Sequence, residues 1–127
     1  MCIRDSLARG QLVNVDTRGP MRGHYEAGKR IYYTRYGQVD LACNLCHDNH
    51  DGQYLRGQLL SQGQTNGFPV YRLKSGQITG LHQRMKQCFV KFRAQPFPAG
   101  SAELVDLEVF LAARGNGLKI ETPAVRY

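Results

Sequence analysis

Residues 43–47 of the sequence, Cys-Asn-Leu-Cys-His, are the ones best suited to chemistry. Two thiols three residues apart lie on one helical turn, where they can add to the two vinyl groups of a haem. The vinyl groups have a fixed separation, which requires this spacing of the thiols. The imidazole directly after the second thiol then lies beneath the porphyrin, where it can ligate the iron. The pattern therefore predicts a covalently bound haem c that is attached to Cys43 and Cys46, with His47 as an axial ligand of the iron.

Two other kinds of site use cysteines at this spacing. A zinc site needs a second pair of ligands, and His50 or Cys88 could join His47, but the sequence has no second Cys-x-x-Cys pair. A thioredoxin-like redox pair follows a buried strand in a βαβ pattern, and the sequence shows neither feature. Haem attachment is the better interpretation, and a zinc-stabilised basic binding module is the more distant alternative.

The iron of such a haem needs a sixth ligand or an open position, and the downstream candidates are His50, His82, Met85 and Cys88. His50 is too close to His47 in the sequence to reach the opposite face of the ring. Met85 is the ligand expected in an electron-transfer cytochrome, where a thioether raises the reduction potential. From its sequence position alone, Cys88 is equally well explained as a small buried side chain. A mono-haem electron carrier with Met85 on the iron and a protein with a reactive Cys88 are therefore both consistent with these residues.

Helices must position these side chains. Apolar residues recur at three- and four-residue spacing from Tyr25 to Tyr36, which predicts an amphipathic helix that ends at Gly37. Residues 81–92 contain no helix breaker and are predicted to form a second helix. Residues 101–114 form the clearest helix, with Ser101 as N-cap, and we expect it to cross the first helix near the edge of the haem.

The segment between these helices, residues 48–80, is rich in glycine and polar residues and is predicted to be mostly loop. No convincing alternation of apolar and polar residues indicates a strand. The sequence therefore predicts an all-α, cytochrome c-like domain over residues 22–127, with long loops wrapped around the haem.

Composition limits the partners of this domain. The chain has 127 residues, the length of one domain, and its 17 Lys and Arg against 10 Asp and Glu give a net charge of +7. The basic residues are scattered and no basic-aromatic motif is present, so nucleic acid is not an expected partner. No apolar run approaches the roughly 20 residues of a membrane-spanning helix.

Over residues 22–126 the sequence resembles the C-terminal haem domain of the SoxA family, the A subunits of the bacterial thiosulfate-oxidising Sox cytochrome complex. The resemblance covers most of the chain and is far more specific than the haem motif alone. The matching stretches are ACNLCHD (42–48), LRG (55–57), SQGQ (61–64), NGFP (66–69), YR (71–72), LHQRMKQC (81–88), FRA (92–94) with Pro96, and GLKIETPAVR (117–126).

The resemblance implies that Cys88 is both the distal iron ligand and the catalytic residue, often as a persulfide, and that Arg84 binds the substrate. The implied activity is that of an L-cysteine S-thiosulfotransferase. Thiosulfate is joined oxidatively to a cysteine of the SoxYZ carrier protein, and the electrons pass to a SoxX-type cytochrome c. Arg84 lies one helical turn before Cys88, where a cation can favour the thiolate and hold a sulfonate oxygen. Arg72 and Arg114 are further basic candidates.

The resemblance also implies a periplasmic protein with an upstream cytochrome-like domain, which in some family members carries a second haem. Residues 1–21 contain no secretory signal. We expect them to be an N-terminal remnant in which residues 1–6 (MCIRDS) are artefactual, so that Cys2 is not a native residue. We expect the signal peptide to lie further upstream.

Overall fold

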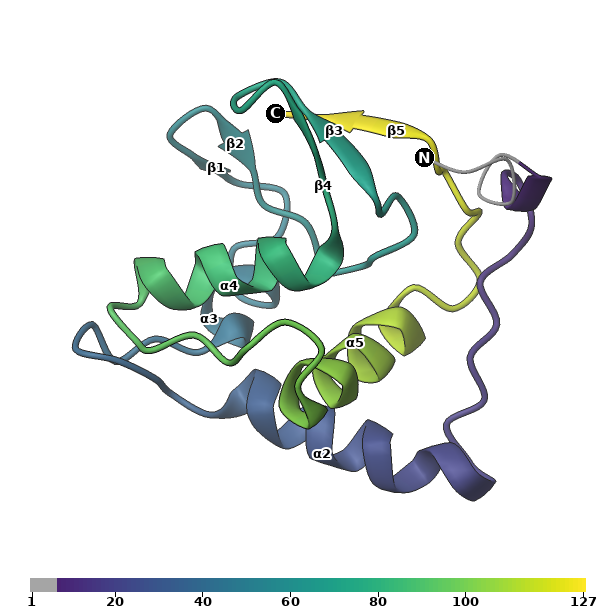
Figure 1. Cartoon of the computed structure of the whole chain (residues 1–127), viewed down its shortest axis with the longest axis horizontal. Coiled ribbons are helices and arrows are strands. Elements are labelled where there is room, and N and C mark those ends of the chain that lie inside the picture. Colours follow the sequence, from purple (N-terminus) through teal and green to yellow (C-terminus); the bar gives the residue numbers. More distant parts are fainter. Residues whose placement is uncertain (1–6) are drawn as a thin grey trace.

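The computed structural model describes residues 7–127, so the expectation that residues 1–6 are artefactual lies outside the described residues. Three main helices and several very short strands make up the fold (Figure 1). The helical elements in chain order are η1 (Gly19–Met21), α2 (Arg22–Tyr33), α3 (Cys43–His47), α4 (Leu81–Lys91) and α5 (Ala102–Arg114). The strands are β1 (Tyr54–Leu55), β2 (Gln58–Leu59), β3 (Val70–Arg72), β4 (Gln77–Thr79) and β5 (Ala124–Arg126).

Helices α2 and α5 lie against each other, as the sequence predicted (Figure 1). Their backbones meet at Gly28, where a Cβ atom would lie 2.0 Å from the carbonyl oxygen of Asp106. At the start of α5 the Ser101 side chain accepts a hydrogen bond from the Leu104 amide, which confirms the predicted N-cap.

The predicted end of the first helix at Gly37 was wrong, because α2 already ends at Tyr33. Thr34 is extended, and its hydroxyl donates to the Arg30 carbonyl oxygen, which occupies an acceptor of the last helical turn. Gly37 belongs instead to a turn closed by the bridge between Tyr36 and Leu41, and it has a φ of 73°.

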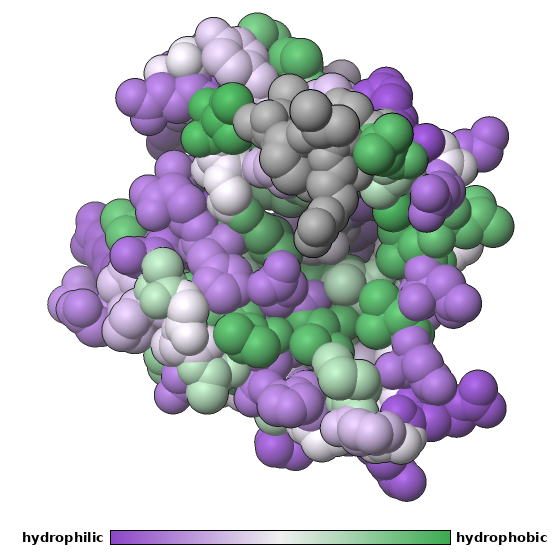
Figure 2. Space-filling model, turned by 45° about the vertical axis from the view of Figure 1, so that its right-hand side comes forward, coloured by the Kyte–Doolittle hydropathy of each residue, from purple (hydrophilic) through white to green (hydrophobic). Residues whose placement is uncertain are grey.

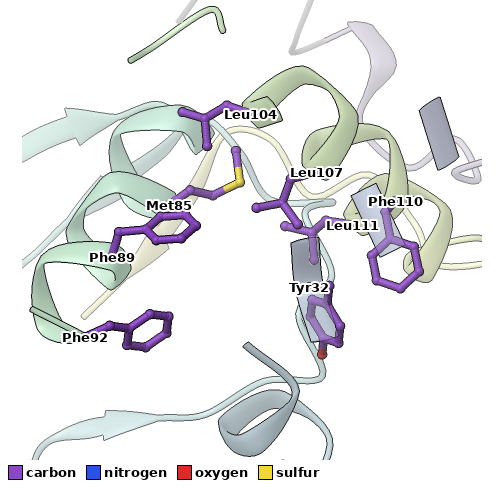
Figure 3. Packing of buried hydrophobic residues seen from close by; sticks show 8 residues of the cluster. All are labelled: Tyr32, Met85, Phe89, Phe92, Leu104, Leu107, Phe110 and Leu111. Carbon is purple, nitrogen blue, oxygen red and sulfur yellow. The ribbon is translucent and has the colours of Figure 1, made fainter. Parts of the chain in front are cut away.

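The apolar core lies between α4, α5 and α2. Figure 3 shows side chains of α4 directed toward side chains of α5, with Tyr32 of α2 beside them. The members of this cluster are Tyr32, Met85, Phe89, Phe92, Leu104, Leu107, Phe110 and Leu111. The four members from α5 recur at the three- and four-residue spacing of an amphipathic helix.

The expectation of an all-α domain was wrong. Strands β1 and β2 pair as an antiparallel ribbon, and a second sheet has the order β4-β3-β5, with β3 antiparallel to β4 and parallel to β5. Val70 and Arg72 of β3 are buried on the inner face of this sheet, whereas Tyr71 between them is exposed on its outer face. Each strand has only two or three residues, too few for an alternating pattern to stand out in the sequence.

On the face drawn in Figure 2, hydrophilic residues are interspersed with apolar ones. Some of the exposed apolar side chains of the molecule belong to the outer face of the three-stranded sheet, where Ile78, Tyr71 and Val125 lie opposite one another on neighbouring strands. Among the described residues, no helix has the length and apolar character needed to cross a membrane.

Candidate functional site

Helix α3 presents the two cysteines and the histidine of the predicted haem site within little more than one turn. The Nδ1 atom of His47 lies 2.6 Å from the carbonyl oxygen of Ser61. A carbonyl oxygen only accepts, so Nδ1 carries the proton and donates it, which leaves Nε2 with a free lone pair. Burial lowers the pKa of His47, and the nearby Arg114 and Arg84 lower it further, against the opposing effect of the Ser61 bond. The ring is therefore neutral and ready to bind a metal through Nε2.

The thiols of Cys43 and Cys46 are free, and Cys43 packs against the same apolar cluster as a third free cysteine, Cys88 of α4. Burial, followed by the nearby Cys88 charge, raises the pKa of Cys43 to about 12. The same two causes raise the pKa of Cys46, while Lys91 acts in the opposite direction. The fold thus brings together cysteines that are more than forty positions apart in the sequence.

The structure separates the candidates for the sixth ligand. Met85 is only 6% exposed and packs in the core with residues of α5 (Figure 3). Both ring nitrogens of His82 are occupied, Nε2 by Glu108 at 2.9 Å and Nδ1 by the Gly100 amide at 3.0 Å. His50 is exposed, and its Nδ1 pairs with the side chain of Gln53. Cys88 is therefore the remaining candidate, and like Cys43 it is partly buried against the apolar cluster.

A cationic groove of about 550 Å³ runs along the outer side of α4, between this helix and the β3–β4 hairpin. Among the described residues its lining contains no acidic side chain. The basic residues that line it are Arg72, Lys74, Arg84, Lys86 and Lys91.

Cys88 lies within electrostatic reach of this groove. Burial lowers the pKa of Arg72, and Arg84 lowers it further, whereas Cys88 opposes the change. The pKa of Lys91 is lowered by burial and then by Arg84, again with Cys88 acting in the opposite direction. Cys88 thus lies one helical turn from Arg84 and from Lys91 of the groove lining, and it packs, like Cys43, against the apolar cluster. Such cations attract a small anion to the neighbourhood of the sulfur.

A polar cluster encloses the other side of His47 and is centred on Asp48. The hydroxyl group of Tyr32 donates to Asp48 Oδ1 at 2.7 Å, and that of Tyr33 donates to Oδ2 at 3.1 Å. Arg114 Nη2 donates to Asp48 Oδ1 at 2.7 Å. Arg114, which the sequence suggested as a basic site residue, thus lies on the His47 side and does not line the cationic groove.

Sequence reasoning missed Lys91, Asp48 and the Ser61 carbonyl group. Lys91 lies three residues after Cys88 and seven after Arg84 on α4, so the helical period could have identified it. Asp48 directly follows His47, but nothing in the sequence indicates that two tyrosines of α2 converge on it. Every residue has a backbone carbonyl group, so the residue type at position 61 does not indicate that its carbonyl oxygen accepts from His47.

The residues present fit a haem c. Two free thiols lie on one short helix, a neutral imidazole with a free Nε2 follows them, and a third free cysteine, Cys88, packs against the same apolar cluster as Cys43. A zinc site fits less well, because the part of the chain that the structure describes contains no cluster of three or more His, Cys, Asp or Glu side chains able to hold a metal ion.

Comparisons with known proteins point in the same direction. The family described as SoxA/TsdA, cytochrome c domain, matches residues 27–120. The L-cysteine S-thiosulfotransferase subunit SoxA of Rhodovulum sulfidophilum is 49% identical over 121 residues, which cover 95% of this chain and 42% of the relative. The corresponding subunit of Paracoccus pantotrophus is also 49% identical over 121 residues, 94% of this chain and 41% of that protein.

Among solved structures, the crystal structure of SoxXA from P. pantotrophus superimposes with a TM-score of 0.93 at 45% sequence identity. The match covers 97% of this chain and 47% of that chain. The chain thus spans less than half the length of the relatives that it matches.

Proposed function

The chain belongs to the SoxA/TsdA cytochrome c domain family, and from this premise we propose that it is the sulfur-transferring haem domain of an L-cysteine S-thiosulfotransferase subunit. The reaction joins the outer sulfur of thiosulfate to the cysteine sulfur of a SoxYZ-type carrier protein. One S–S bond forms, the carrier thiol loses its proton, and two electrons leave for a SoxX-type partner cytochrome. The product is a cysteine S-thiosulfonate on the carrier.

A cytochrome c domain binds haem c, and we assign the attachment to Cys43 and Cys46, with His47 and Cys88 as the axial ligands. When bound, the haem supplies a redox centre that accepts one electron at a time. The hydrogen bond from His47 Nδ1 to the Ser61 carbonyl oxygen holds the imidazole with Nε2 free for the iron. An anionic sulfur from Cys88 favours the ferric state and lowers the reduction potential.

The observation that supports this proposal is the position of Cys88 on α4, where it packs, like Cys43, against the apolar cluster and lies one helical turn from Arg84 and from Lys91, which line the cationic groove. Thiosulfate is a dianion, and the basic lining of the groove attracts it to the sulfur of Cys88. Arg84 lies one turn before Cys88 on α4, and its planar guanidinium group can hold a sulfonate by two parallel hydrogen bonds. We therefore assign Arg84 to substrate binding and Cys88 to catalysis.

We further propose that the protein acts in the periplasm, since covalent haem is attached after export. The relatives are more than twice as long as this chain, and the resemblance allows one or two haems in the full-length subunit. Tests of activity therefore use the full-length subunit together with its partner cytochrome and the carrier protein.

The decisive experiment replaces Cys88 by methionine. Cys88→Met exchanges an anionic sulfur for a neutral one, so we expect a higher reduction potential, a changed electron paramagnetic resonance signal of the ferric protein, and loss of conjugation to the carrier. The matched control is Met85→Leu, which alters a core residue one helical turn away and leaves the signal and the potential unchanged. If Met85→Leu changes the iron signal and Cys88→Met does not, the domain is an electron carrier with Met85 on the iron.

The role of Arg84 is tested by Arg84→Lys, which keeps the charge and removes the forked donor. Loss of one hydrogen bond to a charged group, about 1.5–3 kcal/mol, lowers kcat/KM for thiosulfate by about 10- to 100-fold. The optical spectrum stays the same, because Arg84 does not bind the iron. Unchanged turnover in this variant would contradict the assignment.

A further inference from the structure

Arg114, in the last turn of α5, contacts three separate segments that surround His47. Its Nε donates to the carbonyl oxygen of Gln62 at 2.8 Å, and its Nη2 donates to Asp48 Oδ1 at 2.7 Å. Its guanidinium carbon lies 4.8 Å from the centre of the Tyr32 ring. One side chain thus connects the loop around Gln62, the end of α3 and the last turn of α2.

Two of these contacts lie directly beside the hydrogen bond of the histidine. Gln62 follows Ser61, whose carbonyl oxygen accepts from His47 Nδ1 at 2.6 Å, and Asp48 follows His47 itself. Arg114 therefore binds next to the donor residue on one side and next to the acceptor residue on the other. Because the guanidinium group is planar, the directions of Nε and Nη2 are fixed relative to each other, and they set the separation of the two segments.

The loop passes close to both side chains at this point. Gly63 is buried with a φ of 88°, and a Cβ atom there would lie 3.5 Å from Arg114 Nε and 3.7 Å from the Cβ of His47. These are ordinary van der Waals distances, so the loop at Gly63 lies beside both the arginine and the histidine.

We infer that Arg114 is a positioning residue for the axial histidine: it holds the Ser61 carbonyl group against His47 Nδ1 and so fixes the imidazole ring. A stronger bond at Nδ1 makes the ring a better electron donor to a metal at Nε2. Loosening the loop weakens that donation and raises the reduction potential. The inference rests on the proposed ligation of haem by His47, and it is independent of the role of Cys88.

The test uses Arg114→Lys in the full-length, haem-loaded subunit. Lysine keeps the positive charge and can reach one acceptor, but it cannot hold both in fixed directions. In the reduced, diamagnetic protein, solvent exchange of the His47 Nδ1 proton is followed by nuclear magnetic resonance, and the midpoint potential is measured in parallel. We expect exchange to become about tenfold faster, the equivalent of about 1.4 kcal/mol, and the potential to rise. The matched control Arg30→Lys, in the last turn of α2, changes neither quantity.

Asp48→Asn provides a second variant of nearly the same shape, in which the charge-assisted bond to Arg114 is weakened. Exchange of the Nδ1 proton becomes faster in this variant too, and adding Arg114→Lys produces less than the sum of the two effects, because both act on one contact. The inference is overturned if the variants lose stability while the exchange rate and the potential of Arg114→Lys stay at the wild-type values. Thiosulfate conjugation is not among the readouts, so an error in the proposed sulfur chemistry leaves this test intact, and an error in His47 ligation is visible in the wild-type spectrum.

Discussion

Lys91 lies among like charges of the groove lining, which the proposed anionic substrate would neutralise. Burial and the proximity of Arg84 lower the pKa of Lys91. The charged ammonium group therefore destabilises the folded state when no anion is bound in the groove. Lysines with this kind of environment serve binding at the expense of stability.

We therefore expect Lys91→Gln to stabilise the haem-loaded protein slightly, by up to about 0.5 kcal/mol, and to raise KM for thiosulfate roughly two- to fivefold. Because the pKa of Lys91 is lower in the folded than in the unfolded state, the wild type gains stability as the pH rises through the lowered value, and the difference from the variant shrinks there. Denaturant unfolding at several pH values and steady-state kinetics check both effects. The control Lys29→Gln, on α2 outside the groove, changes KM little. If KM rises equally in the Lys29→Gln and Lys91→Gln variants, Lys91 does not contribute specifically to thiosulfate binding.

At the level of elements, the crossing of α2 and α5 depends on a single missing side chain. A Cβ atom at Gly28 would lie 2.0 Å from the carbonyl oxygen of Asp106 and 2.9 Å from the Cβ of Phe110. A carbonyl oxygen within a helix cannot move aside as a flexible side chain can, so the two helices would have to separate.

Gly28→Ala should therefore lower the free energy of unfolding by about 3 kcal/mol, the upper end of the usual cost of overpacking. Gly23 lies on the same helix, and a Cβ atom there would meet nothing within 4 Å. Gly23→Ala should change stability by no more than about 0.5 kcal/mol, in the favourable direction because alanine is the better helix former. Denaturant titration of the two haem-loaded variants makes the comparison, and similar effects would show that the helices do not pack closely at Gly28.

The helices were predictable because each is long enough to repeat its apolar stripe several times. The sequence analysis placed α4 and α5 to within a residue of their observed bounds, together with the Ser101 N-cap. The strands were not predictable, since β3 pairs with β5 across some fifty residues and neither strand exceeds three residues. The motif of α3 was evident from the sequence, whereas the basic groove arises only when the β3–β4 hairpin folds against α4.

For the molecule as a whole, the buried members of the apolar cluster lie on α2, α4 and α5, except for Phe92 directly after α4, and Cys43 of α3 is among the partly buried residues packed against the cluster. A haem attached to α3 would extend this small core considerably. The attachment is therefore expected to contribute much of the stability of the domain.

Replacing Cys43 and Cys46 together by alanine should leave a colourless and largely unfolded chain. Near-ultraviolet circular dichroism and a haem stain on a denaturing gel are the measurements. The double variant Gln38→Ala/Gln95→Ala, which alters two exposed side chains and neither thiol, should retain both colour and signal. A colourless cysteine variant with the dichroism of the native protein would show that the haem is not needed for folding.

The burial of Cys43 also determines the order of events during biogenesis. A thiolate is the reactive form of cysteine, and burial raises the pKa of Cys43 to about 12, so the closed fold holds almost none of it at neutral pH. On the proposed attachment to Cys43, we therefore expect thioether formation to precede the closing of α3 against the core. A chain that stays unfolded until the haem is attached keeps the Cys43 thiol accessible. A substitution that stabilises the haem-free fold would bury this thiol before the thioether has formed. Such a substitution would lower the yield of mature cytochrome even if it made the finished molecule more stable.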